Sequence, residues 1–354
     1  MKEDKALENL AAKYRPKTLE DMTEQSIVVD IINNICNAPE LTHRNFLFIG
    51  PAGCGKTSIS KIIARKLNGG SLDSDGNLIE IDAASHNGVD SMREIVKQAR
   101  IYPVGAKYKI IVVDECHALS QAAWQVALLT IEEQPAMSVF CWCTTNPEKI
   151  PATILSRVQT FQLSKISLNG INNRLKYIIE QENKEGRNIT YDDDAILYLS
   201  KLAQGGMRNG ITLLDKALSF DNHITIQTLE KSLGLPSYDD YFELLNAIAK
   251  KDNQKIIEII NTTYNSGVNF VKWFDNFFSF ITNIVKFIYL QDINQTMIPG
   301  IYQDKIAKYG TAHSALCLKL SNKLVKMNQE LKTTQYLQEL AISYLCTPPA
   351  PKKG

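Results

Sequence analysis

The sequence lacks the features that would place it in a membrane or carry it across one. Its 354 residues contain no uninterrupted apolar run of the ~20 residues that a membrane-spanning helix needs. The most apolar stretch, 270–290, is interrupted by Lys272, Asp275 and Lys286. Four of the first five residues are charged, so the start of the chain has no apolar core of a signal peptide. We therefore expect a cytoplasmic protein without a membrane partner.

Paired cysteines are also missing. The seven cysteines form no C-x-x-C pair, and four of them fall in or beside apolar segments and a glycine-rich loop: Cys54, Cys116, Cys141 and Cys143. Buried reduced thiols explain this distribution better than disulfides do. A zinc site needs further ligands at fixed spacing, whereas Cys141 and Cys143, at alternate positions of a strand, simply share one buried face. We expect no zinc.

A strong net charge is missing as well. The formal charge of +1 at pH 7 excludes a global attraction to nucleic acid, so any such contact must come from a local patch. With 44% hydrophobic and 22% charged residues, the composition is that of an ordinary globular protein. At ~100–200 residues per domain, the length predicts roughly two or three domains.

A glycine-rich octapeptide lies between the apolar run 46–49 and the segment 58–67, which has helical periodicity. It consists of Gly50, Pro51, Ala52, Gly53, Cys54, Gly55, Lys56 and Thr57. The pattern G-x-x-x-x-G-K-[ST] between a strand and a helix is a phosphate-binding loop, in which backbone N–H groups and the helix N-terminus surround phosphate oxygens. The motif predicts that Lys56 reaches the β- and γ-phosphates and that Thr57 is a ligand of Mg²⁺.

A second apolar run, 109–113, ends in Asp114 and Glu115. In a parallel sheet this places both carboxylates at the edge where the phosphate loop opens. We expect Asp114 to hold Mg²⁺ and Glu115 to polarise the attacking water as a general base. The letters Asp-Glu-Cys-His also occur in superfamily-2 helicases. This chain lacks their second RecA-like domain, with its Gly-Arg-x-Gly-Arg and Ser-Ala-Thr segments, so we reject that alternative.

Three further polar positions fit a nucleotide-hydrolysing site. Thr145 follows the strand 138–143 and lies beside the two carboxylates, where it is placed to sense the γ-phosphate or align the water. Arg157 precedes the last strand, on the far side of the domain from its own loop, so it is placed to enter a neighbouring subunit's site as an arginine finger. Arg208 follows Gly205 and Gly206 at a helix start, within reach of the γ-phosphate. The alternatives are a surface ion pair for Arg157 and a solvated side chain for Arg208.

Strands and helices alternate over residues 1–164, which predicts an α/β domain with a parallel sheet covered on both faces. The expected strands are 46–49, 78–82, 110–114, 138–143 and 159–163. After residue 164 the sequence has no further apolar runs typical of strands, and the patterns that follow are those of helices. We therefore expect a small all-helical domain over 165–236.

Long amphipathic helices with an aromatic stripe follow over 237–346, and such a stripe is typical of a core or a subunit interface. The Pro/Lys-rich end, 347–354, is expected to be disordered.

The order of these motifs resembles that of bacterial DNA polymerase III gamma/tau subunits, the ATPases of the sliding-clamp loader, and more distantly that of replication factor C. The resemblance is dense over 10–220 and weaker over the helical remainder. It rests on the phosphate loop and on the segments 12–19, 79–85, 114–120, 144–151 and 154–157. It implies an AAA+ fold with a lid and an oligomerising collar.

The resemblance also implies cofactors, partners and residue roles. The cofactors are ATP and Mg²⁺, and the partners are other clamp-loader subunits in a ring-like pentamer, a sliding clamp and primer-template DNA. Roles carried over by position are phosphate and Mg²⁺ binding for Lys56 and Thr57, magnesium and water activation for Asp114 and Glu115, first sensor for Thr145, second sensor for Arg208, trans-acting finger for Arg157, and adenine contact for Arg15 and Pro16.

A loader must accept any primed junction, so its DNA contacts go to phosphates and not to bases. In the family these contacts come from helix N-termini that face the ring interior. The candidates in this chain are Ser85, His86, Arg93 and Ser120. For Arg93 the alternative is a solvated helix face.

This chain departs from the family pattern in three places. The four-cysteine zinc module is absent, since 66–78 has no cysteine. The usual Gly-Gln is Glu24-Gln25, which affects the base pocket, and the usual Ser-Arg-Cys is Ser156-Arg157-Val158. The chain resembles a short, gamma-type form of a bacterial or phage replication system. A helicase loader, a recombination ATPase and an ATP-binding scaffold remain alternative functions.

Overall fold

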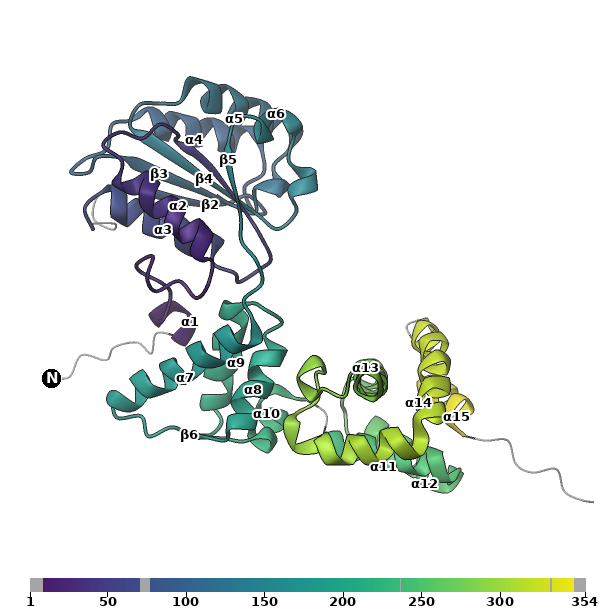
Figure 1. The fold of residues 1–354 in the computed structure, drawn as a ribbon. Helices are drawn as coiled ribbons and strands as arrows, with labels where there is room; N and C mark the ends of the chain where they lie inside the picture. Colours follow the sequence, from purple (N-terminus) through teal and green to yellow (C-terminus); the bar gives the residue numbers. More distant parts are fainter. Residues whose placement is uncertain (1–8, 71–76, 236, 332, 347–354) are drawn as a thin grey trace, which may run out of the picture. The chain divides into compact units, whose positions relative to one another are not determined.

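The computed structural model describes residues 9–70, 77–235, 237–331 and 333–346 (Figure 1). The predicted disordered segment 347–354 lies outside the described residues. So does Pro236, at the predicted boundary between lid and collar.

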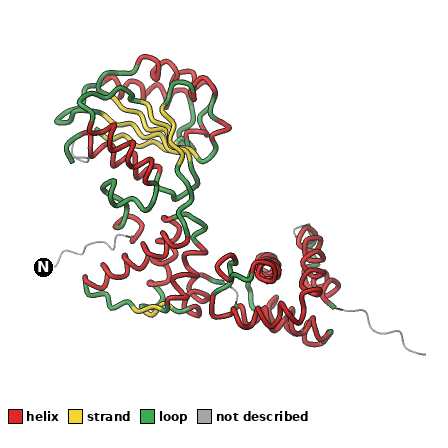
Figure 2. Tube along the Cα trace, viewed as in Figure 1, coloured by secondary structure: helices red, strands yellow, loops and turns green. Residues whose placement is uncertain are grey.

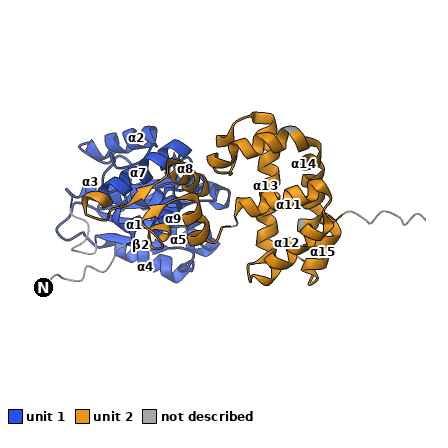
Figure 3. Cartoon of the chain, turned by 90° about the horizontal axis from the view of Figure 1, so that it is seen from below, with its two compact units in different colours: residues 1–181, 203–215 blue, residues 182–202, 216–354 orange. Residues whose placement is uncertain are grey.

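The chain divides into two compact units (Figure 3). Unit 1 comprises 1–181 and 203–215, and unit 2 comprises 182–202 and 216–354. The division into domains at 164 and 236 stays a prediction.

Unit 1 contains a five-stranded parallel sheet, seen as neighbouring yellow strands in Figure 2. The strands are β1 (Asn45–Ile49), β2 (Leu78–Asp82), β3 (Lys109–Asp114), β4 (Ser138–Thr144) and β5 (Gln159–Gln162). Their order is β2-β3-β4-β1-β5, so β1 and β3 both pair with β4. The predicted α/β class is therefore confirmed, and the segments that follow β1, β3 and β4 meet at one edge of the sheet.

Helices cover both faces of this sheet (Figure 1). One face packs against α2 (Ser26–Asn37) and α3 (Lys56–Leu67), and the other against α4 (Val89–Arg100) and α5 (Gln121–Glu133). The smaller elements of unit 1 are α1 (Leu10–Lys13), η1 (Cys116–Ala118), η2 (Pro147–Lys149) and α6 (Ala152–Leu155). Two helices run from one unit into the other, α7 (Leu168–Lys184) and α9 (Met207–Leu218).

Cys141 and Cys143 lie on one face of β4 and are fully buried, whereas Trp142 packs on the opposite face. This confirms the alternation expected of a strand. Burial raises the pKa of the Cys141 thiol to about 12, so it stays neutral. Among the described residues, no group of three or more histidine, cysteine or acidic side chains is placed to hold a metal ion.

Unit 2 is almost entirely helical, and its core is rich in aromatic side chains. Its helices are α8 (Asp193–Leu202), α10 (Ile226–Leu233), α11 (Tyr238–Lys250), α12 (Asn253–Asn265), α13 (Phe270–Leu290), α14 (Gln303–Leu331) and α15 (Leu337–Leu345), with 3-10 turns η3 (Ile293–Gln295) and η4 (Gly300–Tyr302). Trp273, Phe277 and Phe280 of α13 are buried within the unit. This part of the aromatic stripe therefore forms core. No helix in the described part of the chain is both long and apolar enough to span a membrane.

The all-helical prediction for 165–236 missed one feature. Two-residue strands β6 (Thr190–Tyr191) and β7 (His223–Ile224) pair in parallel. Two residues are too few to display the alternation by which a strand is recognised, and their pairing depends on segments 33 residues apart.

A buried lysine connects α8 to the turn that contains η3. Lys201 is 6% exposed, and its Nζ atom donates to the carbonyl oxygens of Ile293 at 2.9 Å and Ile298 at 3.0 Å. Burial lowers the pKa of Lys201 from 10.5 to about 8, although Asp292 and Asp194 partly oppose this shift. The charged form is therefore less favourable in the folded chain than in the unfolded chain.

We expect the free energy of unfolding to rise with pH between about 8 and 10.5, because the unfolded state binds the Lys201 proton more tightly there. Relative to Lys201→Met, the wild type should gain about 2 kcal/mol across this range. Urea unfolding of both proteins at pH 7.5, 9 and 10 measures the difference. Identical pH dependence in the two proteins would show that Lys201 does not titrate in this way.

Candidate active site

The predicted phosphate loop joins β1 to α3, as its motif requires. Gly53 and Gly55 have φ angles of +75° and +110°, which glycine adopts without strain. A Cβ atom at Gly55 would lie 2.7 Å from the Cε atom of Met22, so a larger residue would displace the flexible end of that methionine in addition to straining the backbone. The loop is fixed to the sheet because the Gly50 N–H donates to the Thr144 carbonyl oxygen at 3.1 Å.

The side chains at the end of the loop face the acidic end of β3. Thr57 Oγ1 donates to Asp114 Oδ2 at 2.7 Å, which brings together the two residues predicted to hold Mg²⁺. Lys56 is buried, and its Nζ atom donates to the carbonyl oxygens of Gly50 at 2.9 Å and Pro51 at 3.0 Å. The lysine is thus held against the phosphate loop, where it is predicted to bind the β- and γ-phosphates of a nucleotide.

Glu115 begins a sharp turn after β3. Its φ of +46° lies in the left-handed region, and its backbone N–H donates to Asp114 Oδ1 at 3.0 Å. Thr145 Oγ1 lies 3.1 Å from Glu115 Oε2 and 2.8 Å from Asn146 Oδ1, which share its hydroxyl hydrogen, so the predicted sensor and the predicted base are in contact. His117 Nδ1 lies 3.2 Å from the same oxygen. The sequence motifs assign no role to His117. Its position two residues after the predicted base is the feature that could have indicated one.

The start of α9 lies directly against the phosphate loop. The Met207 N–H donates to the Gly53 carbonyl oxygen at 3.0 Å. A Cβ atom on Gly53 would lie 3.3 Å from the Gly206 Cα atom and 3.5 Å from the Arg208 N atom. The glycine pair before α9 therefore permits close backbone contact, which brings Arg208 to the loop.

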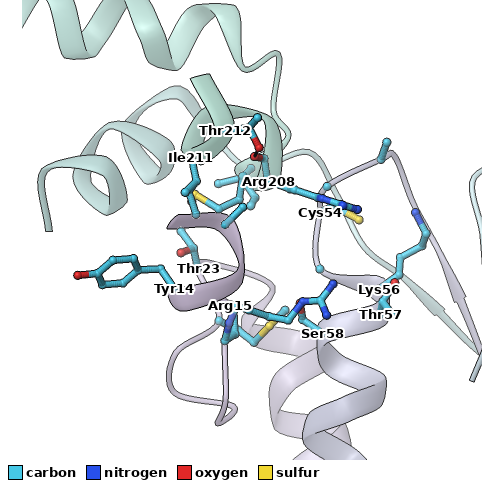
Figure 4. A pocket seen from close by; sticks show the side chains of 18 of the residues that line it. Tyr14, Arg15, Thr23, Cys54, Lys56, Thr57, Ser58, Arg208, Ile211 and Thr212 are labelled. Carbon is cyan, nitrogen blue, oxygen red and sulfur yellow. Dashed lines mark hydrogen bonds between the residues drawn. The ribbon is translucent and has the colours of Figure 1, made fainter. Parts of the chain in front are cut away.

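One cavity of about 480 Å³ joins these elements (Figure 4). Its lining includes every residue predicted to bind nucleotide or Mg²⁺, apart from Gly50 and Pro51: Arg15, Pro16, Ala52, Gly53, Cys54, Gly55, Lys56, Thr57 and Asp114. Glu115 and Arg208 also line it, and Figure 4 shows Arg15 and Arg208 entering from different segments of the chain.

These residues fit a nucleoside triphosphate with Mg²⁺. A glycine loop with positive φ angles leads into a helix N-terminus, which provides N–H donors for phosphate oxygens. The buried Lys56 supplies a cation, and the Thr57–Asp114 pair supplies the hydroxyl and carboxylate oxygens that Mg²⁺ prefers.

Glu24 and Gln25 contact the segment between β5 and α7. The Gln25 side-chain amide donates to the Ser164 carbonyl oxygen at 2.8 Å and accepts from the Ser164 N–H at 3.1 Å. The Ser167 N–H donates to Glu24 Oε2 at 3.0 Å, which satisfies a backbone donor beside the start of α7. Glu24 and Gln25, which stand where the family usually has Gly-Gln, therefore hold the segment before α2 against the residues that connect β5 to α7.

The structure places Arg157 outside the lining of this cavity. It lies between α6 and β5, where Nε is 2.7 Å from Glu132 Oε1 and Nη1 donates to the Thr153 carbonyl oxygen at 2.9 Å. Its side chain is 41% exposed. The residue is thus accessible and separate from the described cavity of its own chain.

The predicted DNA-contacting residues also lie outside the cavity. Ser85 and His86 are exposed before α4, and Ser85 Oγ donates to Asp82 Oδ2 at 3.1 Å. Arg93 is exposed on α4 and pairs with Asp90 at 2.9 Å. Ser120 caps α5 by accepting the Ala123 N–H.

Two family profiles match this chain, and both describe subunits of DNA polymerase III. A family profile described as "DNA polymerase III, delta subunit" matches residues 24–167. A second, described as "DNA polymerase III clamp loader subunit, ATPase lid domain", matches residues 170–223.

Curated relatives extend the match over most of the chain. The gamma subunit of Buchnera aphidicola subsp. Schizaphis graminum is 30% identical over 91% of this chain and 92% of its own length. The gamma subunit of Buchnera aphidicola subsp. Baizongia pistaciae is 34% identical over 74% of each sequence. The gamma/tau subunit of Mycoplasma genitalium is 29% identical over 94% of this chain, which spans 58% of that longer protein.

Solved structures agree at the level of the fold. The Thermotoga maritima RuvB Holliday junction branch migration motor aligns with a TM-score of 0.50 and 19% identity, over 66% of this chain and 79% of its own. The fold is therefore of the AAA+ type, followed by helical regions. Together with the family profiles and the gamma relatives, this shows that the chain belongs to the gamma/tau family of DNA polymerase III clamp-loader subunits.

Proposed function

We propose that this chain is the ATP-hydrolysing motor subunit of a sliding-clamp loader. ATP binding lets the assembled loader open and hold the clamp, and primed DNA triggers hydrolysis and release. The observation that carries the proposal is a single cavity lined by the phosphate loop, both acidic residues and the arginine of α9. Membership of the gamma/tau family supports the clamp-loading role.

Each side chain of the cavity has a role in this proposal. Lys56 and the loop N–H groups bind the β- and γ-phosphates, and Arg15 and Pro16 line the adenine end. Thr57 and Asp114 hold Mg²⁺, which when bound neutralises charge on the phosphates.

Glu115 accepts a proton from the attacking water as the water oxygen bonds to the γ-phosphorus and the bond from that phosphorus to the ADP oxygen breaks. Thr145 orients Glu115 through the 3.1 Å hydrogen bond. Arg208 senses the γ-phosphate from the start of α9.

The proposal also includes an assembly. The AAA+ domain (1–164), lid (165–236) and collar (237–346) would form a pentamer with other clamp-loader subunits. Arg157 would complete the site of a neighbouring subunit, since it is exposed and lies outside its own cavity. DNA phosphates would contact the helix starts that carry Ser85, His86, Arg93 and Ser120.

ATP hydrolysis by the chain together with its partner subunits tests this function. We expect primed DNA and a clamp together to stimulate hydrolysis more than either does alone. Absence of that stimulation would contradict clamp loading. Stimulation by a helicase would favour a helicase loader, and absence of any turnover would favour an ATP-binding scaffold.

A further inference from the structure

The imidazole of His117 lies against the carboxylate that we assign as the general base. Its Nδ1 atom is 3.2 Å from Glu115 Oε2 and 3.1 Å from Thr144 Oγ1. His117 is part of the 3-10 turn η1, directly after β3, and its side chain is 17% exposed. The ring is therefore held between the end of β4 and the base.

This contact requires a hydrogen atom on Nδ1. A carboxylate oxygen offers only lone pairs, so a bare Nδ1 would place two acceptors 3.2 Å apart. Thr144 Oγ1, the other neighbour of Nδ1, already accepts the Asn146 backbone N–H at 3.0 Å. A hydrogen on Nδ1 can be directed at Glu115 Oε2, whereas the direction of the hydrogen bond with the Thr144 hydroxyl depends on the imidazole tautomer.

Both side-chain contacts to the base fall on the same carboxylate oxygen. Thr145 Oγ1 lies 3.1 Å from Oε2 and shares its single hydroxyl hydrogen with Asn146 Oδ1 at 2.8 Å, and His117 Nδ1 approaches Oε2 at 3.2 Å. Two contacts from different elements, one after β4 and one in η1, fix the plane of the carboxylate. They leave Oε1 to accept a proton from water.

The backbone at the base gives a second reason for such contacts. Glu115 has φ +46° and ψ 40°, a left-handed conformation that is uncommon for residues other than glycine. A residue in this conformation persists when its surroundings hold it in place. Thr145 and His117 supply that support on the side chain, and Asp114 supplies it on the backbone N–H.

We propose that His117 is a positioning residue for ATP hydrolysis, which with Thr145 holds Oε2 of Glu115 so that Oε1 acts as the base. This rests on the proposed function, because it requires Glu115 to be the general base. Since a displacement of about 1 Å at a catalytic group can cost about 10²-fold in rate, loss of one of two restraints should lower turnover by about 10-fold or more.

The experiment compares the basal ATPase activity of the full chain, in its assembled complex, for His117→Asn, His117→Gln and His117→Phe. Asparagine can place an N–H donor near the Nδ1 position, glutamine places it farther out, and phenylalanine has none. We expect phenylalanine and glutamine to lower kcat by about 10-fold with KM for ATP unchanged, and asparagine to stay within about 3-fold of wild type.

A double substitution tests whether His117 acts through the base. In a Glu115→Gln background, His117→Phe should cause no further loss of turnover, because residues that act as a unit are not additive. Thermal unfolding of each variant shows which of them fold. If phenylalanine prevents folding, the comparison of asparagine with glutamine decides the matter.

Three outcomes would overturn the proposal: unchanged or raised kcat in His117→Phe, equal activity of the asparagine and glutamine variants, or a full further loss in the Glu115→Gln background. Because basal hydrolysis is measured, these results do not depend on stimulation by DNA and a clamp. Failure of the clamp-loading function would appear only as missing stimulation in the wild type.

Discussion

Glu115→Gln is expected to lower ATP hydrolysis by about 10²- to 10⁴-fold, the range attributed to a general base. Glutamine has nearly the same size and keeps an oxygen that can accept the Thr145 hydroxyl, but it cannot take a proton from water. The phosphate loop and the Thr57–Asp114 pair are unchanged, so the affinity for ATP should stay close to that of the wild type. Single-turnover hydrolysis and nucleotide binding by the assembled complex measure both quantities.

The matched control is Glu94→Gln, which removes one carboxylate from the exposed face of α4. It should leave hydrolysis unchanged, because Glu94 does not line the cavity. Retained hydrolysis in Glu115→Gln would show that another group activates the water. An equal loss of ATP binding would mean that Glu115 serves mainly to shape the site.

The central strands were predictable because they are buried on both faces. The three central strands, β1, β3 and β4, agree with the expected ranges to within one residue at each end, and the partly exposed edge strands β2 and β5 agree as closely. Fully buried parallel strands appear in a sequence as short apolar runs, and the runs at 46–49 and 109–113 are of this kind. The two-residue strands β6 and β7 have no such signal.

Much of the candidate site was predictable because its motifs fix spacing and backbone shape together. The phosphate loop needs glycine at positions with positive φ, and the acids follow a buried strand, so residue type and position are linked. The parallel sheet then brings the segments after β1, β3 and β4 to one edge.

Side-chain partners far apart in sequence could not be predicted. Glu24 contacts Ser167, 143 residues away, and the direction of its side chain depends on a φ of +61° that no pattern in the sequence indicates. The contact of His117 with Glu115 similarly depends on the left-handed turn at the base. Such contacts arise from the packed structure and not from local periodicity.

Arg157→Ala should leave ATP binding intact and lower hydrolysis in the assembled complex by about 10³-fold or more, the effect of losing an arginine finger. In the single chain, Arg157 pairs with Glu132 at the surface, and such exposed pairs contribute only about 0–1 kcal/mol. The ion pair therefore offers little resistance to the arginine turning toward a neighbour. The control is Arg100→Ala, which removes a comparably exposed arginine paired with the adjacent Glu133.

A mixture of two inactive variants separates action in trans from action in cis. Arg157→Ala keeps its own phosphate loop and base, and Glu115→Gln keeps its finger. In mixed complexes some sites would combine an intact loop and base from one subunit with Arg157 from the next, so hydrolysis should partly return. If Arg157 acted within its own chain, every site would lack one group and the mixture would stay inactive. Recovery on mixing therefore requires that the active site be shared between two subunits.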